Sequence, residues 1–120
     1  MATRELNAEN FQSSITDNDF VIVDFWAPWC GPCRSFAPTF EAMSEQHPEI
    51  VFAKVDTEAQ TSIAAAFNIR SIPTLMVFRD QIIIYAEAGA LSAGALGQVI
   101  AQAQALDMNQ VRSEIAAQGV

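Results

Sequence analysis

Hydrophobic residues fill the segment 20–26, Phe-Val-Ile-Val-Asp-Phe-Trp, which only Asp24 interrupts. A strand that is apolar on both faces is typical of the centre of a sheet covered by helices on both sides. From Pro32 to His47 the apolar residues change to spacings of three and four, which indicate an amphipathic helix. The pattern predicts a central strand followed by a helix, which Pro38 should bend.

Short apolar runs then alternate with helical patterns along the chain. Strands are predicted at 3–6, 49–55, 74–78 and 81–87, and helices at 7–14, 57–67 and 92–106. The joint at 79–80 is so short that the last two strands should form an antiparallel hairpin. We therefore expect one α/β domain with a central mixed sheet of about five strands, flanked by helices on both faces.

Residues 107–120 follow the predicted domain of residues 1–106. Asp107 can cap a short helix in which Met108, Val111 and Ile115 fall on one face. We expect a C-terminal helical extension that packs on the domain or trails from it.

Charge and composition exclude several classes of function. The chain has 120 residues, only six Lys and Arg, and a formal net charge of -8. Nucleic acid or an anionic membrane as main partner would need clustered cations. The first 20 residues lack the apolar stretch of a signal peptide, and no apolar run is long enough to span a membrane. We expect a cytoplasmic protein, and persistent disulfides are rare in that compartment.

Both cysteines lie in the motif Trp29-Cys30-Gly31-Pro32-Cys33, between the predicted central strand and the helix. A bridge across so small a ring would stabilise the fold by only roughly 2 kcal/mol. A closed zinc site needs four ligands and would have to recruit His47 and a carboxylate. Reversible thiol chemistry is therefore favoured over zinc binding or a structural pair.

Cys30 stands just before the predicted helix, where unpaired backbone N–H groups and the helix dipole stabilise a thiolate. We expect Cys30 to attack a disulfide and Cys33, one turn deeper, to resolve the mixed disulfide. Pro32 favours the first helical turn and Gly31 lets the loop approach closely. Neither residue adds a cation, which favours a reductant over a strong oxidant.

Asp24 is expected to be a buried carboxylate with a raised pKa. With Lys54 on a neighbouring strand, Asp24 could exchange the proton of Cys33, directly or through one water, while Lys54 tunes it. The alternative is that Asp24 sits at a strand end and hydrogen-bonds a loop. Pro73 marks the start of a strand, after either a trans or a cis bond.

These motifs resemble the thioredoxin family over about residues 3–106. The resemblance rests on the run 23–33, Pro38, Lys54-Val55-Asp56, Ile72-Pro73-Thr74 and Gly89-Ala90-Leu91. It implies the thioredoxin fold and a protein-disulfide reductase with Cys30 as nucleophile, Cys33 as resolving thiol and Asp24 as buried proton carrier. It also implies a cis bond before Pro73, which would face the dithiol.

The resemblance further implies an apolar platform around Cys30, with the Ile72 backbone pairing with an extended substrate strand. The expected substrate-binding residues are Trp29, Gly31, Pro32, Ile72, Pro73, Gly89 and Ala90. No bound cofactor is implied, because electrons would come from NADPH through a thioredoxin reductase. That reductase and disulfide-containing proteins are the expected partners of a monomer. The alternative function is a binding module that uses the same platform independently of its redox state.

Two departures from the family pattern concern the last hairpin. Asp80-Gln81 stands where the family usually has Asp-Gly, and Gln is strained at positive φ, so we expect a different turn. Ile82-Ile83-Ile84 is unusually apolar for an edge strand. It predicts either a partner or dimer contact, or burial under the last helix.

Overall fold

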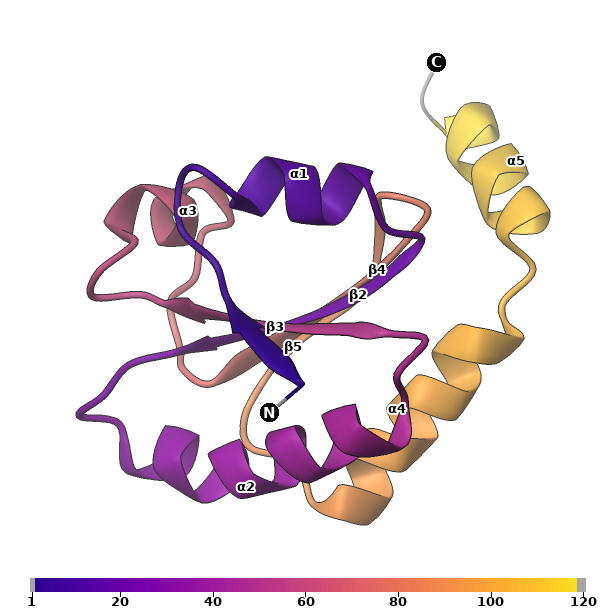
Figure 1. Cartoon of the computed structure of the whole chain (residues 1–120). Coiled ribbons are helices and arrows are strands. Elements are labelled where there is room, and N and C mark those ends of the chain that lie inside the picture. Colours follow the sequence, from indigo (N-terminus) through magenta and orange to yellow (C-terminus); the bar gives the residue numbers. More distant parts are fainter. Residues whose placement is uncertain (1, 119–120) are drawn as a thin grey trace.

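Five strands form one mixed sheet in the computed structural model, which describes residues 2–118. The elements in chain order are β1 (Thr3–Glu5), α1 (Phe11–Thr16), β2 (Phe20–Trp26), α2 (Gly31–Gln46), β3 (Val51–Asp56), α3 (Thr61–Ala66), β4 (Thr74–Arg79), β5 (Ile82–Ala88), α4 (Ala93–Ala105) and α5 (Met108–Gln118). The sheet order is β1-β3-β2-β4-β5, with β1, β3 and β2 parallel; β4 runs antiparallel to β2, and β5 antiparallel to β4. Figure 1 shows α2 and α4 on one face and α1 and α3 on the other. The predicted fold is confirmed.

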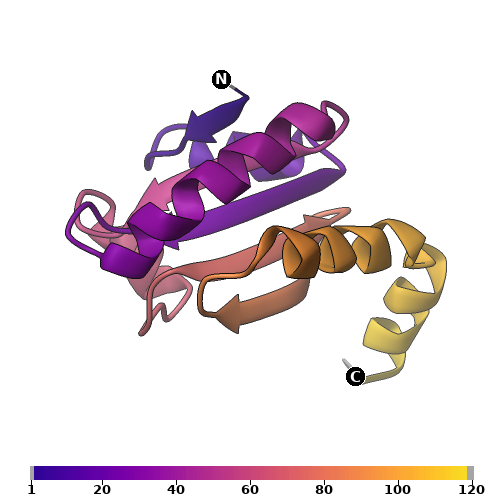
Figure 2. The ribbon, with the colours of Figure 1, turned by 90° about the horizontal axis from the view of Figure 1, so that it is seen from below.

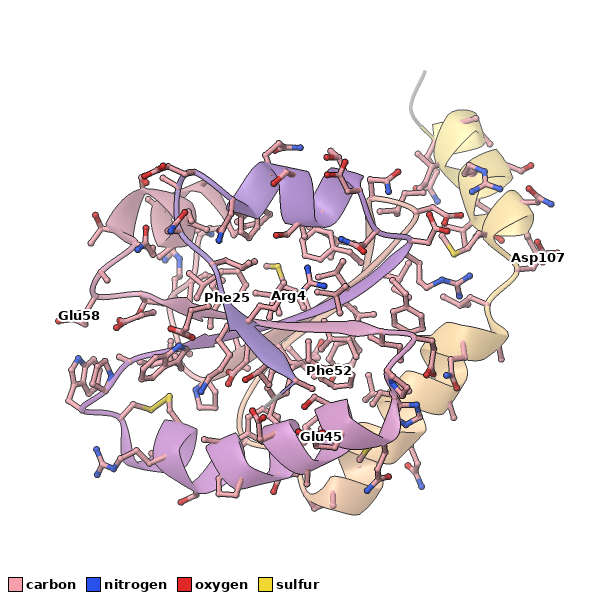
Figure 3. The ribbon with its side chains drawn as sticks, viewed as in Figure 1. Arg4, Phe25, Glu45, Phe52, Glu58 and Asp107 are labelled. Atoms are coloured by element: carbon pink, nitrogen blue, oxygen red, sulfur yellow. A yellow bond between two sulfur atoms is a disulfide. The ribbon has the colours of Figure 1, made fainter. Side chains whose placement is uncertain are left out.

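The central strand β2 separates two hydrophobic cores. Val21, Val23 and Phe25 belong to the core under α1 and α3, whereas Ile22 belongs to the core under α2 and α4. Figure 3 shows Phe25 and Phe52 on opposite sides of the sheet. Because side chains alternate along a strand, Asp24 points to the same face as Ile22, towards α2. The sheet thus places one carboxylate beneath the helix that carries the cysteines.

Two helices are shorter than the sequence pattern predicted, because polar side chains ahead of each helix close separate turns. Asn7 was expected to cap the first helix, but its Oδ1 accepts the backbone N–H groups of Glu9 and Asn10, and α1 begins only at Phe11. The helix expected at 57–67 covers 61–66, since Oδ1 of Asp56 holds a turn through the N–H of Glu58. Side-chain oxygens of this kind compete with helix formation.

The sequence predicted that Asp80-Gln81 would form a different turn from the one that Asp-Gly usually forms, but the β4–β5 turn is of that usual type. Both residues have positive φ, 51° and 66°, as the central residues of a type I′ turn do. Contacts with distant parts of the chain stabilise the turn. Nε2 of Gln81 donates to the carbonyl of Asn18 at 3.3 Å, and Arg112 forms an ion pair with Asp80 at 2.7 Å. The expectation of a different turn was wrong, because contacts from distant segments offset the local strain.

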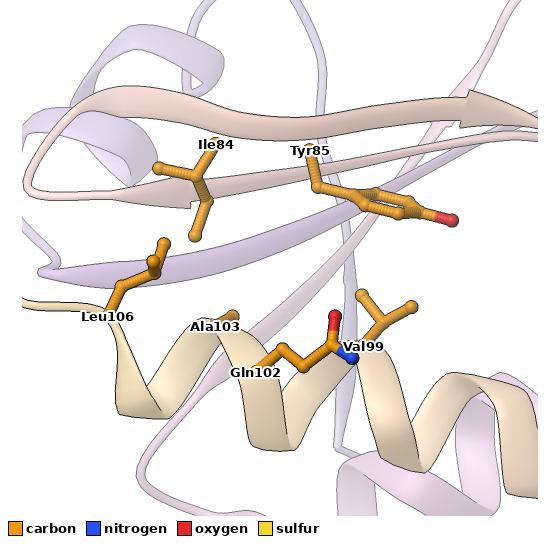
Figure 4. A pocket seen from close by; sticks show the side chains of 6 residues that line it. All are labelled: Ile84, Tyr85, Val99, Gln102, Ala103 and Leu106. Carbon is orange, nitrogen blue, oxygen red and sulfur yellow. The ribbon is translucent and has the colours of Figure 1, made fainter. Parts of the chain in front are cut away.

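The edge strand β5 is partly covered by α4. Ile84 and Tyr85 pack against the core under α4, and with Val99, Ala103 and Leu106 they border an apolar hollow of about 170 Å³ (Figure 4). The alternative of burial under the last helix therefore holds for Ile84, whereas Ile83 on the other face is 44% exposed. A bulge next to the Phe78–Ile83 pair makes edge-to-edge strand pairing less favourable. A partner contact at Ile83 stays a prediction.

The segment after α4 forms the helix α5. Figures 1 and 2 show α5 leaving the end of α4 at an angle. Met108 is buried, and the Arg112–Asp80 ion pair ties α5 to the β4–β5 turn. Ile115 remains exposed. None of the helices within residues 2–118 has the length and apolar character needed to cross a bilayer.

The positive φ of Gln81 gives a stability prediction. Gln81→Ala removes the side-chain hydrogen bonds but keeps a Cβ at positive φ. Gln81→Gly removes the hydrogen bonds and the Cβ. The Gly variant should therefore be more stable than the Ala variant by about 1 kcal/mol in urea unfolding. An Ala variant as stable as the Gly variant would show that this turn stores no backbone strain.

Candidate active site

The two cysteines begin α2 and are joined by a disulfide, with their Cα atoms 5.2 Å apart. Cys30 is the N-cap residue, with an extended backbone, and its Sγ accepts the backbone N–H of Cys33 at 3.2 Å. Figure 3 shows the bond between the two sulfur atoms at the start of the helix. The prediction that the pair opens the helix is confirmed, and one sulfur lies where unpaired N–H groups converge.

Burial alone does not distinguish the two thiols. Cys30 is 4% exposed and Cys33 is 2% exposed, although Cys33 was expected to lie one turn deeper and nearer the core. Their positions differ instead: the Cys30 sulfur caps the helix, and Cys33 lies inside the first turn. We therefore expect the helix terminus, and not exposure to water, to make Cys30 the more acidic thiol.

The zinc alternative does not fit the arrangement. His47 is the C-cap of α2 and lies at the opposite end of that helix from Cys33. At the helical rise per residue, the length of α2 between them is about 20 Å. His47 contacts Glu49 instead, with Nδ1 3.1 Å from a carboxylate oxygen. It cannot join the cysteines around one metal ion.

A second loop lies against the disulfide. The Ile72–Pro73 bond is cis, as the resemblance implied, and the Ile72 carbonyl oxygen is 3.8 Å from Sγ of Cys30. The carbonyl of Pro73 accepts the backbone N–H of Gly89 at 2.8 Å, which brings a third segment to the same place. Gly89 has a φ of 112°, a conformation that favours glycine.

The surroundings of the disulfide are open to solvent on the outer side. Trp29 is 64% exposed, and Gly31, Pro32, Gly89 and Ala90 are exposed as well. Ile72 is half-buried and packs on the small cluster of Ala27 and the two cysteines. The structure thus places Ile72 directly against the disulfide, with Pro73 next to it in the chain and Gly89 hydrogen-bonded to Pro73. The neighbouring Trp29, Gly31, Pro32 and Ala90 are accessible.

Asp24 is buried without a hydrogen-bond partner. It is 1% exposed, and neither carboxylate oxygen meets a donor in the part of the chain that the structure describes. Burial raises the pKa of Asp24 to about 7, the positive charge of Lys54 lowers it, and the negative charge of Glu5 raises it. Asp24 lies within β2 between Val23 and Phe25, so the alternative of a loop-bonded strand end was wrong.

Lys54 is the register neighbour of Asp24 on the parallel strand β3. Its Nζ lies over the ring of Trp26, 4.6 Å from the centroid. An ammonium group over an indole face is stabilised by the ring quadrupole. The sequence prediction that Asp24 and Lys54 lie on neighbouring strands is confirmed.

Sequence reasoning missed Glu5. It is the register neighbour of Lys54 on the other side, on β1. Burial raises the pKa of Glu5, whereas the positive charge of Lys54 lowers it. Glu5, Lys54 and Trp26 line a groove of about 660 Å³ whose other wall includes Arg34 and Glu41 of α2. The only signal for Glu5 is the pairing of β1 with β3, which residue patterns do not reveal.

Comparison with known proteins identifies the family. The Thioredoxin family profile matches residues 2–102. Putative thioredoxin 2 of Streptomyces coelicolor is 54% identical over 117 residues, which cover 98% of this chain and 87% of that protein. Thioredoxin of Porphyra purpurea is 43% identical over 67% of this chain and 77% of its own length.

Solved structures give the same result. The structure of Plasmodium falciparum thioredoxin superposes with a TM-score of 0.77 at 36% identity, covering 82% of this chain and 97% of that one. A mutant thioredoxin from Halobacterium salinarum gives a TM-score of 0.79 at 30% identity, over 88% and 93%. Since fold, sequence and the helix-capping disulfide agree, the chain belongs to the thioredoxin family and is a disulfide oxidoreductase.

Proposed function

We propose that the chain reduces disulfides in other proteins, with Cys30 as the attacking thiolate and Cys33 as the resolving thiol. The observation that carries these roles is the Cys30 sulfur at the N-cap of α2, where it accepts the N–H of Cys33 at 3.2 Å. A thiolate at this position gains a charge-assisted hydrogen bond and the favourable helix dipole. Cys33, inside the turn, has no comparable position.

The reaction consists of two exchanges. The Cys30 thiolate attacks one sulfur of the substrate disulfide, forms a mixed disulfide and releases the other substrate sulfur as a thiolate. The Cys33 thiolate then attacks Sγ of Cys30, which forms the Cys30–Cys33 disulfide and releases the second substrate thiolate. The substrate gains two electrons and the dithiol loses two. The described disulfide is the oxidised end state of this cycle.

Asp24 is proposed to take the proton that Cys33 must lose before it attacks. A carboxyl group with a pKa of about 7 is half ionised at neutral pH, so it can accept a proton and return it. Asp24 points to the α2 side of the sheet, and Cys33 is buried in the first turn of α2. Lys54 stabilises the ionised form of Asp24.

Substrates are proposed to dock as an extended strand against the Ile72 backbone. The Ile72 carbonyl lies beside the Cys30 sulfur, and Trp29 is exposed next to it. Main-chain pairing does not depend on side chains, which permits many protein substrates. The exposed residues Gly31, Pro32, Gly89 and Ala90 would line this surface together with the buried Pro73.

The family membership supports the remaining assignments. We assign the supply of electrons to NADPH through a thioredoxin reductase, and the other partners to disulfide-containing proteins. The protein would act as a monomer in the cytoplasm, where a reductant of this kind maintains thiols and cell redox homeostasis.

The cysteine roles predict two different defects. Cys30→Ser should abolish NADPH-coupled reduction of insulin in the presence of a thioredoxin reductase, because no thiolate remains to attack. Cys33→Ser should instead accumulate a mixed disulfide with the substrate, visible as a covalent adduct on non-reducing gels. The double Cys→Ser variant is the control for redox-independent binding. Full insulin reduction by Cys30→Ser would refute the assignment.

The buried carboxylate predicts how stability depends on pH. The pKa of Asp24 is 3.8 as an ordinary value and about 7 in the folded chain, so the native state binds the proton more tightly. Stability conferred by this group is fully present below about pH 4 and is lost as pH rises through 7. Urea unfolding should find Asp24→Asn more stable than the wild type at pH 8 by about 4 kcal/mol, with no such gain at pH 4. A gain that does not change with pH would contradict the raised pKa.

The proposed proton transfer predicts a kinetic defect as well. Asp24→Asn should slow the resolution of the mixed disulfide at pH 7 by roughly 10-fold to 100-fold, because no group then accepts the Cys33 proton. The rate of the first attack by Cys30 on the substrate is the internal control and should change far less. Stopped-flow measurement of both steps distinguishes them, and an unchanged resolution rate would remove Asp24 from the mechanism.

A further inference from the structure

Three charged residues form one row across the sheet. Glu5 on β1 pairs in register with Lys54 on β3, and Lys54 pairs in register with Asp24 on β2. Register neighbours on adjacent strands project from the same face, about 5 Å apart. Lys54 therefore stands between two carboxylates, one exposed at the sheet edge and one buried at its centre.

Trp26 orients the outer part of this row. Its ring lies under the Lys54 ammonium at 4.6 Å from the centroid. Its indole N–H interacts with the carboxylate of Glu5 and lowers the pKa of that group, although the two groups do not meet the geometry of a hydrogen bond. Glu5, Lys54 and Trp26 line the same groove. One aromatic side chain thus contacts the ammonium group and also faces the exposed carboxylate.

Lys54 makes no direct ion pair with either carboxylate in the part of the chain that the structure describes. The inner carboxylate, Asp24, has no hydrogen bond to any described residue. An ammonium group held by Asp24 alone would be drawn to that unpaired charge, since attraction is strongest where water is excluded. A second carboxylate on the outer side competes for the same cation.

We propose that Glu5 is a positioning residue for the proposed proton transfer: its carboxylate keeps the Lys54 ammonium at the outer part of the row, over Trp26, so that Lys54 only partly neutralises Asp24. This inference rests on the proposed role of Asp24 in the proton transfer. Without Glu5, Lys54 turns inward and stabilises ionised Asp24 more strongly. Asp24 then binds the Cys33 proton less readily at neutral pH.

Other charged groups lie on the elements around Asp24. They are Arg4 on β1, Asp56 further along β3, Arg79 on β4, Glu87 on β5, and Arg34, Glu41 and Glu45 on α2. Arg34 donates to the Pro28 carbonyl at 2.9 Å, and Glu41 accepts from Thr3 at 2.6 Å. Among these groups and Glu5, only Glu5 is in register with Lys54 on the side away from Asp24.

Glu87 provides a matched control. It pairs in register with Leu75, which pairs with Asp24, so Glu87 lies two strands from Asp24 just as Glu5 does. The residue between is an uncharged leucine instead of a lysine. Glu87→Gln removes the same charge at the same spacing, about 10 Å, without altering the partner of Lys54.

The test is the pH titration of the Asp24 carboxyl carbon by NMR in the disulfide form, where neither cysteine titrates. Glu5→Gln should move the titration midpoint of the Asp24 carboxyl group to lower pH by roughly half a pH unit, and Glu87→Gln should leave that midpoint unchanged. In a Lys54→Met background, Glu5→Gln should have a clearly smaller effect, because only the direct repulsion between the Glu5 and Asp24 charges is then removed.

An unchanged midpoint in Glu5→Gln, or an equal change in Glu5→Gln and Glu87→Gln, would overturn the proposal. The same holds if Glu5→Gln keeps its full effect in the Lys54→Met background. These outcomes are separate from the test of the proposed function, because the midpoint of Asp24 is measured without turnover. If the kinetics of Asp24→Asn show that Asp24 takes no part in the reaction, the effect of Glu5 on the titration of Asp24 can still hold.

Discussion

The chemistry of this protein depends on the interaction between the Cys30 sulfur and the first turn of α2. The N-terminus of a helix leaves backbone N–H groups without partners, and here one of them, from Cys33, donates to the sulfur. Strand β2 delivers the chain to this point, and Pro32 suits the first helical turn. The backbone itself thus supplies the stabilisation that an attacking thiolate needs.

The buried carboxylate beneath α2 is the second constraint. An unpaired charge in the core reduces stability, so Asp24 destabilises the fold when it is ionised. Asp24 shares its face of the sheet with Lys54 and Glu5, so its protonation depends on a row of charges that reaches the sheet edge. In the proposed scheme the helix terminus provides the nucleophile and this row manages the proton of the resolving thiol.

The sequence predicted the parts of the fold that have strong local patterns. The bounds of β2 were right because seven nearly continuous apolar residues need a doubly covered strand. The start of α2 was predicted to within one residue, because Pro32 lies in the first turn after the capping Cys30. The starts of α1 and α3 were wrong, since Asn7 and Asp56 close turns of their own. The prediction for the β4–β5 turn was wrong because contacts between distant segments, such as that of Arg112 with Asp80, stabilise the turn that forms.

The candidate site was predictable to a similar extent. The cysteine pair, Asp24 and Lys54 could be identified from residue type and neighbouring pattern. Glu5 could not, because the pairing of β1 with β3 arises only from the folded topology. The substrate-binding roles of Trp29 and Ile72, and the division at residue 106, stay predictions.

The most direct test of the central claim is to titrate each thiol separately in the reduced protein, by the pH dependence of alkylation at Cys30 and Cys33. The account predicts that Cys30 forms a thiolate at clearly lower pH than a free cysteine, and that Cys33 does so only at higher pH. Two thiols that ionise together at the pH of a free cysteine would contradict it.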